Sequence, residues 1–423
     1  MYQAPSWLSR SKARTLLILC TAMGVLFQAQ SLNAGEEMQQ PKTPRARLRA
    51  TLAAANSGRS GYASLSFSPD GRILATGDQI KPAKLWDVAT GQLRHTLTNH
   101  KASIRVVFSP GGRTLATSGD KKVALWNTET GGLQHMLTGS TGWFGYVFTV
   151  EFSPDGRLLL AGSSDGRARL WDVATGQLRA TLGRHKGLAV VAVFSPDGRT
   201  IATTSDGDRE PKLWGTATGR LRATLIGHRA GVHDILFSPD GRTIATASLD
   251  DTVKLWDAET GELKATLAGH RSTIYQTVFS PDGRTLATAS RDGTARLWDV
   301  TTGRLKHILS GYGYLVQRVA FSPDGRTVTA GGREAKLWNV ETGRLIATLS
   351  GHENDIEDIA YSPNGDVLVT ASKESARVWN AATGELITTL EDARYPVAFS
   401  PDGRVLATAG EKNTVLLWDV VVR

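Results

Sequence analysis

Three groups of residues in this chain have the types and spacing that enzymes use for chemistry. The segment Gly162-Ser163-Ser164-Asp165-Gly166 fits the Gly-x-Ser-x-Gly pattern that presents a nucleophilic serine. Histidine, serine and aspartate also recur together along the chain, and these are the residue types of a catalytic triad. His228 and His233 precede Asp234 in one short segment, and zinc accepts all three as ligands. Whether any of these groups reacts depends on the elements that position it.

The elements around these groups are short predicted strands that repeat along the chain. A turn of the form Ser-Pro-x-Gly precedes a tryptophan nine times, at a mean step of about 41.5 residues, which is typical of propeller blades. In the unit Phe279–Gly303, the turn at Ser280–Gly283 is followed by strands separated by tight turns at Asp292-Gly293 and Thr302-Gly303. Each unit is therefore predicted to be a four-stranded antiparallel meander. The marker tryptophans are Trp86, Trp126, Trp171, Trp214, Trp256, Trp298, Trp338, Trp379 and Trp418.

With these turns and tryptophans the chain resembles the WD-repeat β-propeller family over about residues 47–423. The resemblance and the repeat count predict an all-β fold, a single closed β-propeller of nine four-stranded blades. The alternatives are a ring of seven or eight blades with extra strands, or two partial rings. In this family an N-terminal outer strand completes the last blade. Arg47–Leu52 copies the predicted outer strand Arg220–Leu225, so the resemblance implies that it closes the ring.

The resemblance also implies a hydrogen-bond network inside the blades, made by a loop histidine, a strand serine or threonine, a turn aspartate and the strand tryptophan. Its recurrence on equivalent blades favours a structural role, because an enzyme needs one site. Ser163, Asp165 and Trp171 match without a histidine. The residues that match in full are His100, Ser118, Asp120 and Trp126; His228, Ser248, Asp250 and Trp256; and His270, Ser290, Asp292 and Trp298.

The reactive patterns are weak once they are placed on these strands. A nucleophile elbow lies between a strand and a helix, whereas the Ser163 motif lies between two predicted strands. No further carboxylates join His228 and His233 at metal-ligand spacing, and no nucleotide-binding motif precedes a helix. We therefore expect no catalytic residue, no metal and no cofactor. The alternative is a propeller hydrolase or lyase that uses the central channel, with charged residues at matching points of the inner strands: Arg105, Asp234, Arg318 and Asp358.

Departures from the repeat indicate where a binding surface lies. The resemblance implies that the loops before the inner strands and the turns after the second strands share one rim. The largest departures are Thr138–Phe148 and Gly311–Tyr314, which are rich in the aromatic residues that dominate interface hot spots. This rim is predicted to bind a protein or peptide partner; the competing interpretation is that the aromatic residues fill gaps in blades without a loop histidine. The predicted binding residues are Trp143, Phe144, Tyr146, Phe148, Arg229, His233, Arg271, Tyr275, Arg291, Tyr312, Tyr314, Glu357 and Tyr395.

The N-terminal residues 1–34 have the layout of a secretory signal peptide. Three cations precede the apolar run Thr15–Phe27, and Ala34-Gly35 is the expected cleavage point. An uncleaved membrane anchor is the alternative, although the run is shorter than the roughly 20 residues of a membrane span. Residues 35–46 are predicted to be a polar linker. We expect an exported protein, periplasmic or extracellular, or one that is anchored to the membrane only through this segment.

The charge of the chain argues against a nucleic-acid partner. The formal net charge is +9, but the arginines and lysines recur in turns and at strand edges and do not gather in one stretch. Cys20, inside the apolar run, is the only cysteine, so no disulfide framework is expected. The predicted state is a monomeric propeller.

Overall fold

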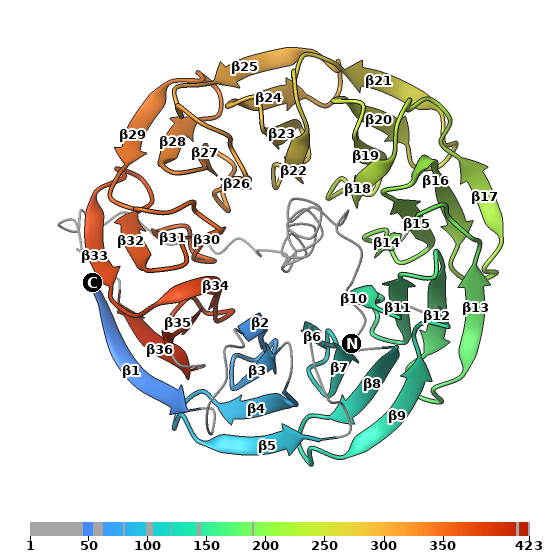
Figure 1. The fold of residues 1–423 in the computed structure, drawn as a ribbon, viewed down its shortest axis with the longest axis horizontal. Coiled ribbons are helices and arrows are strands. Elements are labelled where there is room, and N and C mark those ends of the chain that lie inside the picture. The colour runs from blue at the N-terminus through green and yellow to red at the C-terminus, as the bar shows by residue number, and fades with distance from the viewer. Residues whose placement is uncertain are drawn as a thin grey trace, which may run out of the picture.

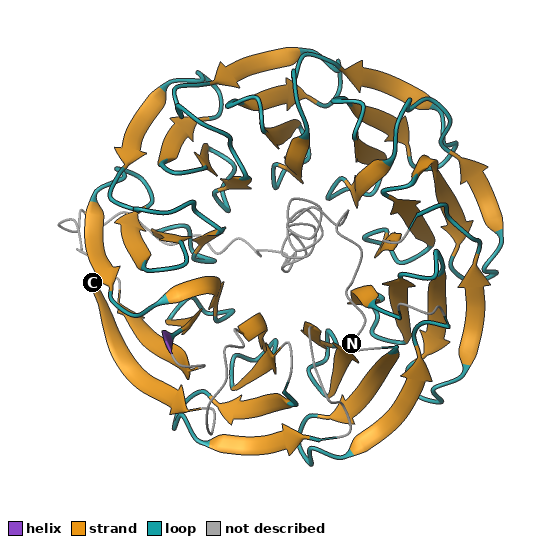
Figure 2. Ribbon diagram, viewed as in Figure 1, coloured by secondary structure: helices purple, strands orange, loops and turns teal. Residues whose placement is uncertain are grey.

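The computed structural model describes residues 45–53, 62–78, 81–98, 105–119, 121–141, 145–187, 190–411 and 414–421. This part of the chain forms 36 β-strands and no α-helix. The strands make nine four-stranded antiparallel sheets in one closed ring (Figures 1 and 2). The predicted nine-bladed β-propeller is therefore confirmed. The predicted signal peptide and most of the predicted linker lie outside the described residues.

Each blade is a meander that runs outwards from the inner strand. Blades 1 to 3 consist of β2 (Tyr62–Phe67), β3 (Ile73–Asp78), β4 (Ala83–Asp87) and β5 (Leu93–Leu97); β6 (Arg105–Phe108), β7 (Thr114–Gly119), β8 (Lys122–Asn127) and β9 (Leu133–Thr138); and β10 (Val147–Phe152), β11 (Leu158–Ser163), β12 (Ala168–Asp172) and β13 (Leu178–Leu182). Blades 4 to 6 consist of β14 (Val190–Phe194), β15 (Thr200–Ser205), β16 (Asp208–Gly215) and β17 (Leu221–Thr224); β18 (Val232–Phe237), β19 (Thr243–Ser248), β20 (Val253–Asp257) and β21 (Leu263–Leu267); and β22 (Ile274–Phe279), β23 (Thr285–Ser290), β24 (Ala295–Asp299) and β25 (Leu305–Leu309).

Blades 7 and 8 consist of β26 (Arg318–Phe321), β27 (Thr327–Gly331), β28 (Ala335–Asn339) and β29 (Leu345–Leu349); and β30 (Asp358–Tyr361), β31 (Val367–Ala371), β32 (Ala376–Asn380) and β33 (Leu386–Leu390). Blade 9 joins the two ends of the described chain: β34 (Arg394–Phe399), β35 (Val405–Ala409), β36 (Thr414–Val421) and β1 (Arg45–Ala53).

The Ser-Pro-x-Gly turns work as their residue types predict. In blade 6 the Ser280 hydroxyl donates to Asp282 Oδ1 (2.6 Å) and accepts from the backbone N–H of Thr285 (2.9 Å). Gly283 has a φ of +71°, which glycine adopts without the steric cost that other residues incur. The turn therefore reverses the chain tightly and places two strands side by side.

Strand β1 closes the ring. Leu48 pairs with Trp418, and a bulge separates Leu48 from Ala50, as a bulge also does where Leu221 pairs with Trp214 in blade 4. Arg49 Nε donates to Asp419 Oδ1 of β36 (2.7 Å). The predicted closure is confirmed. Arg45 and Ala46, which the sequence placed in the linker, belong to β1, because their backbones pair with Val421 and Val420.

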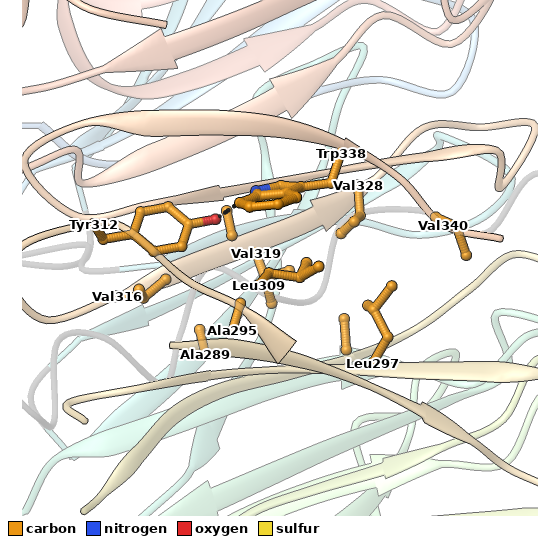
Figure 3. Close-up of a cluster of buried hydrophobic side chains, with 12 residues drawn as sticks. Ala289, Ala295, Leu297, Leu309, Tyr312, Val316, Val319, Val328, Trp338 and Val340 are labelled. Carbon is orange, nitrogen blue, oxygen red and sulfur yellow. Dashed lines mark hydrogen bonds between the residues drawn. The ribbon is translucent and has the colours of Figure 1, made fainter. Parts of the chain in front are cut away.

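The core lies between neighbouring blades, because each sheet buries both faces. Leu297 and Leu309 of blade 6 pack against Val319, Val328 and Trp338 of blade 7 (Figure 3). Similar clusters join the other blades around the ring. This sharing of cores is why a single meander is not stable alone and a closed ring is. No helix in the described part of the chain has the length and apolarity to cross a bilayer.

Candidate functional site

Two kinds of loop share one face of the propeller. Entrance loops lead from the outer strand of one blade to the inner strand of the next, and hairpin turns join the second and third strands of a blade. In blade 5 the backbone N–H of Arg229 in the entrance loop donates to Asp250 Oδ2 of the hairpin turn (2.9 Å), and Leu249 N–H donates to Gly231 O (2.9 Å). We call this face of entrance loops and hairpin turns the loop rim.

The loop histidine connects the entrance loop to the hairpin turn and to the second strand of its blade. His228 Nδ1 lies 2.9 Å from Asp250 Oδ2, and His228 Nε2 lies 2.8 Å from the hydroxyl of Thr246, which also accepts from Trp256 Nε1 (2.8 Å). A neutral imidazole with its proton on Nδ1 satisfies all of these hydrogen bonds, because Nδ1 then donates to Asp250 and the threonine hydroxyl donates to Nε2. Burial lowers the pKa of His228, more strongly than Asp250 raises it. Blade 6 repeats the arrangement with His270, Asp292, Thr288 and Trp298.

The hydroxyl that joins the histidine to the tryptophan is not the one assigned from the sequence. The sequence assigned Ser248 to the network, but the joining hydroxyl belongs to Thr246. Ser248 Oγ instead donates to the carbonyl oxygens of Ala230 and Gly231 (3.1 and 3.0 Å) and accepts from Asp250 N–H (3.1 Å). It therefore ties the entrance loop to the hairpin turn. In blade 6 Ser290 likewise donates to Ser272 O (2.9 Å).

Blade 4 contains a complete network that sequence reasoning missed. His185 Nδ1 lies 3.0 Å from Asp208 Oδ2, its Nε2 lies 2.8 Å from Thr203 Oγ1, and Trp214 Nε1 donates to the same hydroxyl (2.8 Å). The histidine follows an arginine and not a glycine, and the hairpin carries its aspartate later than in blade 5. The spacing in the sequence could have identified this histidine, because His185 follows the buried Leu182 at the same distance at which His228 follows Leu225.

In blade 2 the sequence assigned a residue to the network that does not take part in it. His100 and Asp120 lie outside the described residues. Ser118 pairs with Arg105 across the sheet, and its buried hydroxyl has no hydrogen-bond partner among the described residues. Trp126 Nε1 donates to Thr117 (2.9 Å). Assigning Ser118 to the network is wrong because Ser118 comes directly after this threonine, so its side chain points to the opposite face of the sheet.

The serine of the Gly-x-Ser-x-Gly motif forms hydrogen bonds with both members of a buried ion pair. Ser163 Oγ donates to Asp165 Oδ1 (2.6 Å) and accepts from Arg169 Nη1 (3.1 Å). Arg169 Nη2 lies 2.6 Å from Asp165 Oδ2, with side-chain exposures of 5% and 7%. Burial alone would raise the pKa of Asp165, but the bonds from Arg169, Ser163 and the Thr141 N–H lower it well below its usual range. Asp165 also holds the blade 3 entrance loop, because Thr141 N–H donates to its Oδ2 (2.9 Å).

The charged residues of the inner strands join neighbouring blades. Asp234 accepts from the Thr277 hydroxyl of the next blade (3.0 Å), Asp358 Oδ2 accepts from Val397 N–H (3.1 Å), and Arg318 Nε donates to Glu357 O (2.6 Å). Burial raises the pKa of both carboxyl groups. These residues and Arg105 occupy matching positions in four different blades, and the described residues contain no group of three or more His, Cys, Asp or Glu that could hold a metal ion.

Tyr312 is not exposed on the loop rim. It is 5% exposed, and its hydroxyl accepts from Trp338 Nε1 (2.8 Å) inside blade 7 (Figure 3). It follows Leu309 as His228 follows Leu225, so it takes the place of the loop histidine and bonds the tryptophan directly. The prediction that Tyr312 binds a partner is therefore wrong, and for this residue the gap-filling interpretation describes the structure.

Five predicted binding residues occupy one equivalent position around the ring. Each lies four residues before the aromatic residue that ends its inner strand, at the bulge or just before the strand. His233 is 3% exposed and bonds Ile274 O through Nε2 (2.8 Å), so predicting it as a contact residue is wrong. The other four are partly buried: Phe148, Tyr275, Glu357 and Tyr395.

The exposed members of the predicted set lie in two parts of the loop rim. Tyr146, 50% exposed, lies in the blade 3 entrance loop, and Trp143 and Phe144 of the same loop lie outside the described residues. Tyr314, 60% exposed, belongs to the entrance loop of blade 7. The other exposed members are Arg229, Arg271 and Arg291 on blades 5 and 6. Sequence reasoning missed two exposed apolar residues on the same side, Ile226 (72%) and Leu249 (46%).

Comparison with known proteins decides the family. The family model of the WD domain, G-beta repeat, matches residues 91–127, 131–172, 176–214, 219–257, 261–299, 303–339, 343–380 and 387–419. The chain belongs to the WD repeat family. WD repeat propellers are typically protein-interaction scaffolds, and they generally bind protein partners.

Curated relatives of this WD repeat protein match about a third of its length. Protein tipD of Dictyostelium discoideum is 33% identical over 141 residues, which are 33% of this chain and 22% of that protein. An uncharacterized WD repeat-containing protein of Synechocystis is 30% identical over 147 residues (34% and 41%). Eukaryotic translation initiation factor 3 subunit I of Lodderomyces elongisporus is 28% identical over 167 residues (34% and 48%). The matched region spans less than half of each relative.

A partly buried glutamate of an inner strand makes the stability of this WD repeat propeller dependent on pH. Glu151 of β10 accepts from Phe194 N–H of the next blade (3.1 Å), yet burial raises its pKa to about 8. The folded state then holds a proton that the unfolded state has lost, so stability falls as pH rises from about 4.5 through about 8. Glu151→Gln keeps an acceptor and removes the titration. We expect it to match the wild type near pH 4 and to exceed it by on the order of 2–4 kcal/mol near pH 9.

The measurement is urea denaturation of both proteins across this pH range. The control is Glu259→Gln, which makes the same chemical change at an exposed position. Parallel profiles for Glu151→Gln and the wild type would show that folding does not raise the pKa of this carboxyl group.

Proposed function

We propose that this WD repeat protein is a non-enzymatic protein-interaction scaffold that binds a protein or peptide partner on its loop rim. The observation that supports this function is the exposure of Tyr146, Tyr314 and three arginines on loops that are fastened to the blades. Tyrosine and arginine are enriched at interface hot spots, and a loop that is ordered before binding loses less conformational entropy when a partner docks.

The anchoring of these loops is specific. Asp165 holds the entrance loop before Tyr146, Asp250 and Asp292 hold the loops of Arg229 and Arg271, and Tyr312 holds the loop of Tyr314. In each case a hydrogen bond fastens the loop that carries the exposed side chain. The residue types that resemble catalytic groups take part in this anchoring, which favours a binding surface over a reaction centre.

We also propose that the protein is exported or attached to the cell envelope. The support is the sequence of residues 1–34, whose cationic start, short apolar run and small residues at 34 and 35 are those of a signal peptide. The partner is then a protein or peptide outside the cytoplasm, and the propeller acts as a monomer. Mass spectrometry of the mature N-terminus tests this proposal; a cytoplasmic protein that retains Met1 would reject export.

The binding proposal is tested by affinity capture from the native envelope fraction with the immobilised propeller. Tyr146→Ala combined with Tyr314→Ala is expected to reduce partner recovery by roughly tenfold or more, because it removes two exposed aromatic contacts. Leu178→Ala combined with Leu221→Ala is the matched control, since these outer-strand residues are 53% and 50% exposed. Equal recovery by the folded tyrosine variant and the wild type would reject the loop rim as the binding surface.

A further inference from the structure

One hairpin turn of blade 6 gathers basic and aromatic side chains from three segments. Arg291 N–H, in the turn, donates to Thr273 O of the blade 6 entrance loop (2.9 Å), and Arg271 N–H of the same loop donates to Asp292 Oδ2 (3.1 Å). On the other side of the turn, Val316 N–H of the blade 7 entrance loop donates to Ser290 O (3.0 Å). The backbone of Arg291 is therefore fixed between the two entrance loops.

Tyr314 and Tyr275 flank this turn. The carbonyl of Tyr314 lies against Gly293, whose φ is +81° and whose missing side chain makes room for it. Burial raises the pKa of Tyr275, and Arg291 is the cation whose charge acts on its hydroxyl, with Tyr314 close by. We call Arg271, Arg291, Tyr275 and Tyr314 the blade 6 corner.

The two arginine side chains of the corner form no ion pair with the nearest carboxylates of the described residues. The Asp292 carboxylate beneath them is saturated: Oδ1 accepts from Thr294 N–H and its hydroxyl (3.0 and 2.6 Å), and Oδ2 from His270 Nδ1 and Arg271 N–H (2.8 and 3.1 Å). The side chains of Arg271 and Arg291 are exposed and form no ion pair with any described residue. Asp355, the other carboxylate near Tyr275, accepts from Gln317 (3.1 Å).

The neighbouring blade repeats this scaffold with an apolar residue. Leu249 takes the position of Arg291, with its N–H on Gly231 O (2.9 Å), and is 46% exposed. Arg229 takes the position of Arg271, and its N–H donates to Asp250. Adjacent blades thus offer guanidinium groups beside tyrosines and then an exposed leucine.

We propose that the blade 6 corner binds the carboxylates of an acidic peptide segment, and that Leu249 takes an apolar side chain of the same segment. Guanidinium groups bind carboxylates through two parallel hydrogen bonds, and the flanking tyrosines add contact area and hydroxyl groups. The positive net charge of the chain favours approach of an acidic segment. The inference rests on the proposed function, since it names the chemistry of the partner on the same rim.

The test uses purified propeller and two short fluorescein-labelled peptides of the same leucine, tyrosine and glycine content, one with glutamate at alternate positions and one with glutamine there. Fluorescence anisotropy is expected to show at least about tenfold tighter binding of the glutamate peptide, and this preference weakens at high salt because exposed charges are screened. Arg271→Gln combined with Arg291→Gln is expected to abolish the preference. Arg284→Gln keeps it, because this exposed arginine of blade 6 belongs to the Ser-Pro-x-Gly turn on the opposite face.

Equal affinity of the wild type for both peptides would overturn the proposal, and so would a preference that the double arginine variant retains. Circular dichroism and thermal melting confirm that the variant is folded. The peptide result is independent of partner capture. If partner recovery falls in the Tyr146 and Tyr314 double variant but the propeller shows no preference for the glutamate peptide, only this inference fails. If the propeller prefers the glutamate peptide but partner recovery is the same for the double variant and the wild type, the proposed function fails.

Discussion

Asp165→Ala is expected to destabilise the propeller by about 3–5 kcal/mol, because it leaves the guanidinium of Arg169 buried without its counter-ion. The two side chains are 5% and 7% exposed, and Asp165 accepts from Arg169, Ser163 and Thr141. The loss of the last of these bonds also releases the entrance loop that carries Tyr146. Urea denaturation measures the cost, and limited proteolysis between residues 138 and 148 reports the release of the loop.

A double-mutant cycle separates the ion pair from the packing around it. Arg169→Leu in the Asp165→Ala background removes the unpaired charge, so we expect it to recover on the order of half of the lost stability. Glu411→Ala is the control, because Glu411 pairs with Arg394 at side-chain exposures of 50% and 37%, where an ion pair is worth about 0–1 kcal/mol. A cost below about 1 kcal/mol for Asp165→Ala would show that the pair does not hold blade 3 together.

Leu52→Ala is expected to cost about 2–5 kcal/mol, the range for removing a buried leucine side chain from a packed core. Leu52 of β1 is 1% exposed and packs with Leu74 and Trp86 of blade 1 and with Leu417 of blade 9. It therefore seals the one seam of the ring where the two ends of the described chain meet. We expect denaturation at lower urea concentration and faster proteolysis of β1 than of any internal strand.

Leu48→Ala is the matched control on the same strand. Leu48 pairs with Trp418 but is 46% exposed, so its truncation is expected to change the free energy of unfolding by less than about 1 kcal/mol. If Leu52→Ala were as mild as Leu48→Ala, β1 would not be the element that keeps the ring closed.

Much of the fold follows from the amino-acid sequence, because its turns are specified by local chemistry. The Ser-Pro-x-Gly turn determines its own reversal through the Ser280 hydroxyl, the proline and the positive φ of Gly283. Repeating this turn nine times with a tryptophan predicted the number of blades. The closure by Arg47–Leu52 was predictable because a copied outer strand carries the same pairing pattern as the original.

The side-chain partners were much less predictable. The sequence assigned Ser118 and Ser248 to the same role, but Thr117 and Thr246 bond the tryptophans. Ser118 is next to its threonine and so faces the other side of the sheet, whereas Ser248 lies two residues past Thr246, where its strand ends and the entrance loop is within reach. The network of His185 was missed because a different hairpin moves its aspartate along the sequence. Tyr312 and Tyr314 are two residues apart, but Tyr312 is 5% exposed and Tyr314 is 60% exposed.

The repeating architecture could be predicted from the sequence: nine meanders, their turns, and the N-terminal strand that completes the last blade. These features rest on interactions between residues that are close along the chain or copied at a fixed period. The folded structure was needed to show which groups are buried and hydrogen-bonded and which are exposed. Ser163, which bonds Arg169, and Arg291, on the loop rim, are examples. The physical reason is that burial depends on contacts between loops and blades that are far apart in sequence, and a shift of one residue reverses the side of the sheet that a side chain faces.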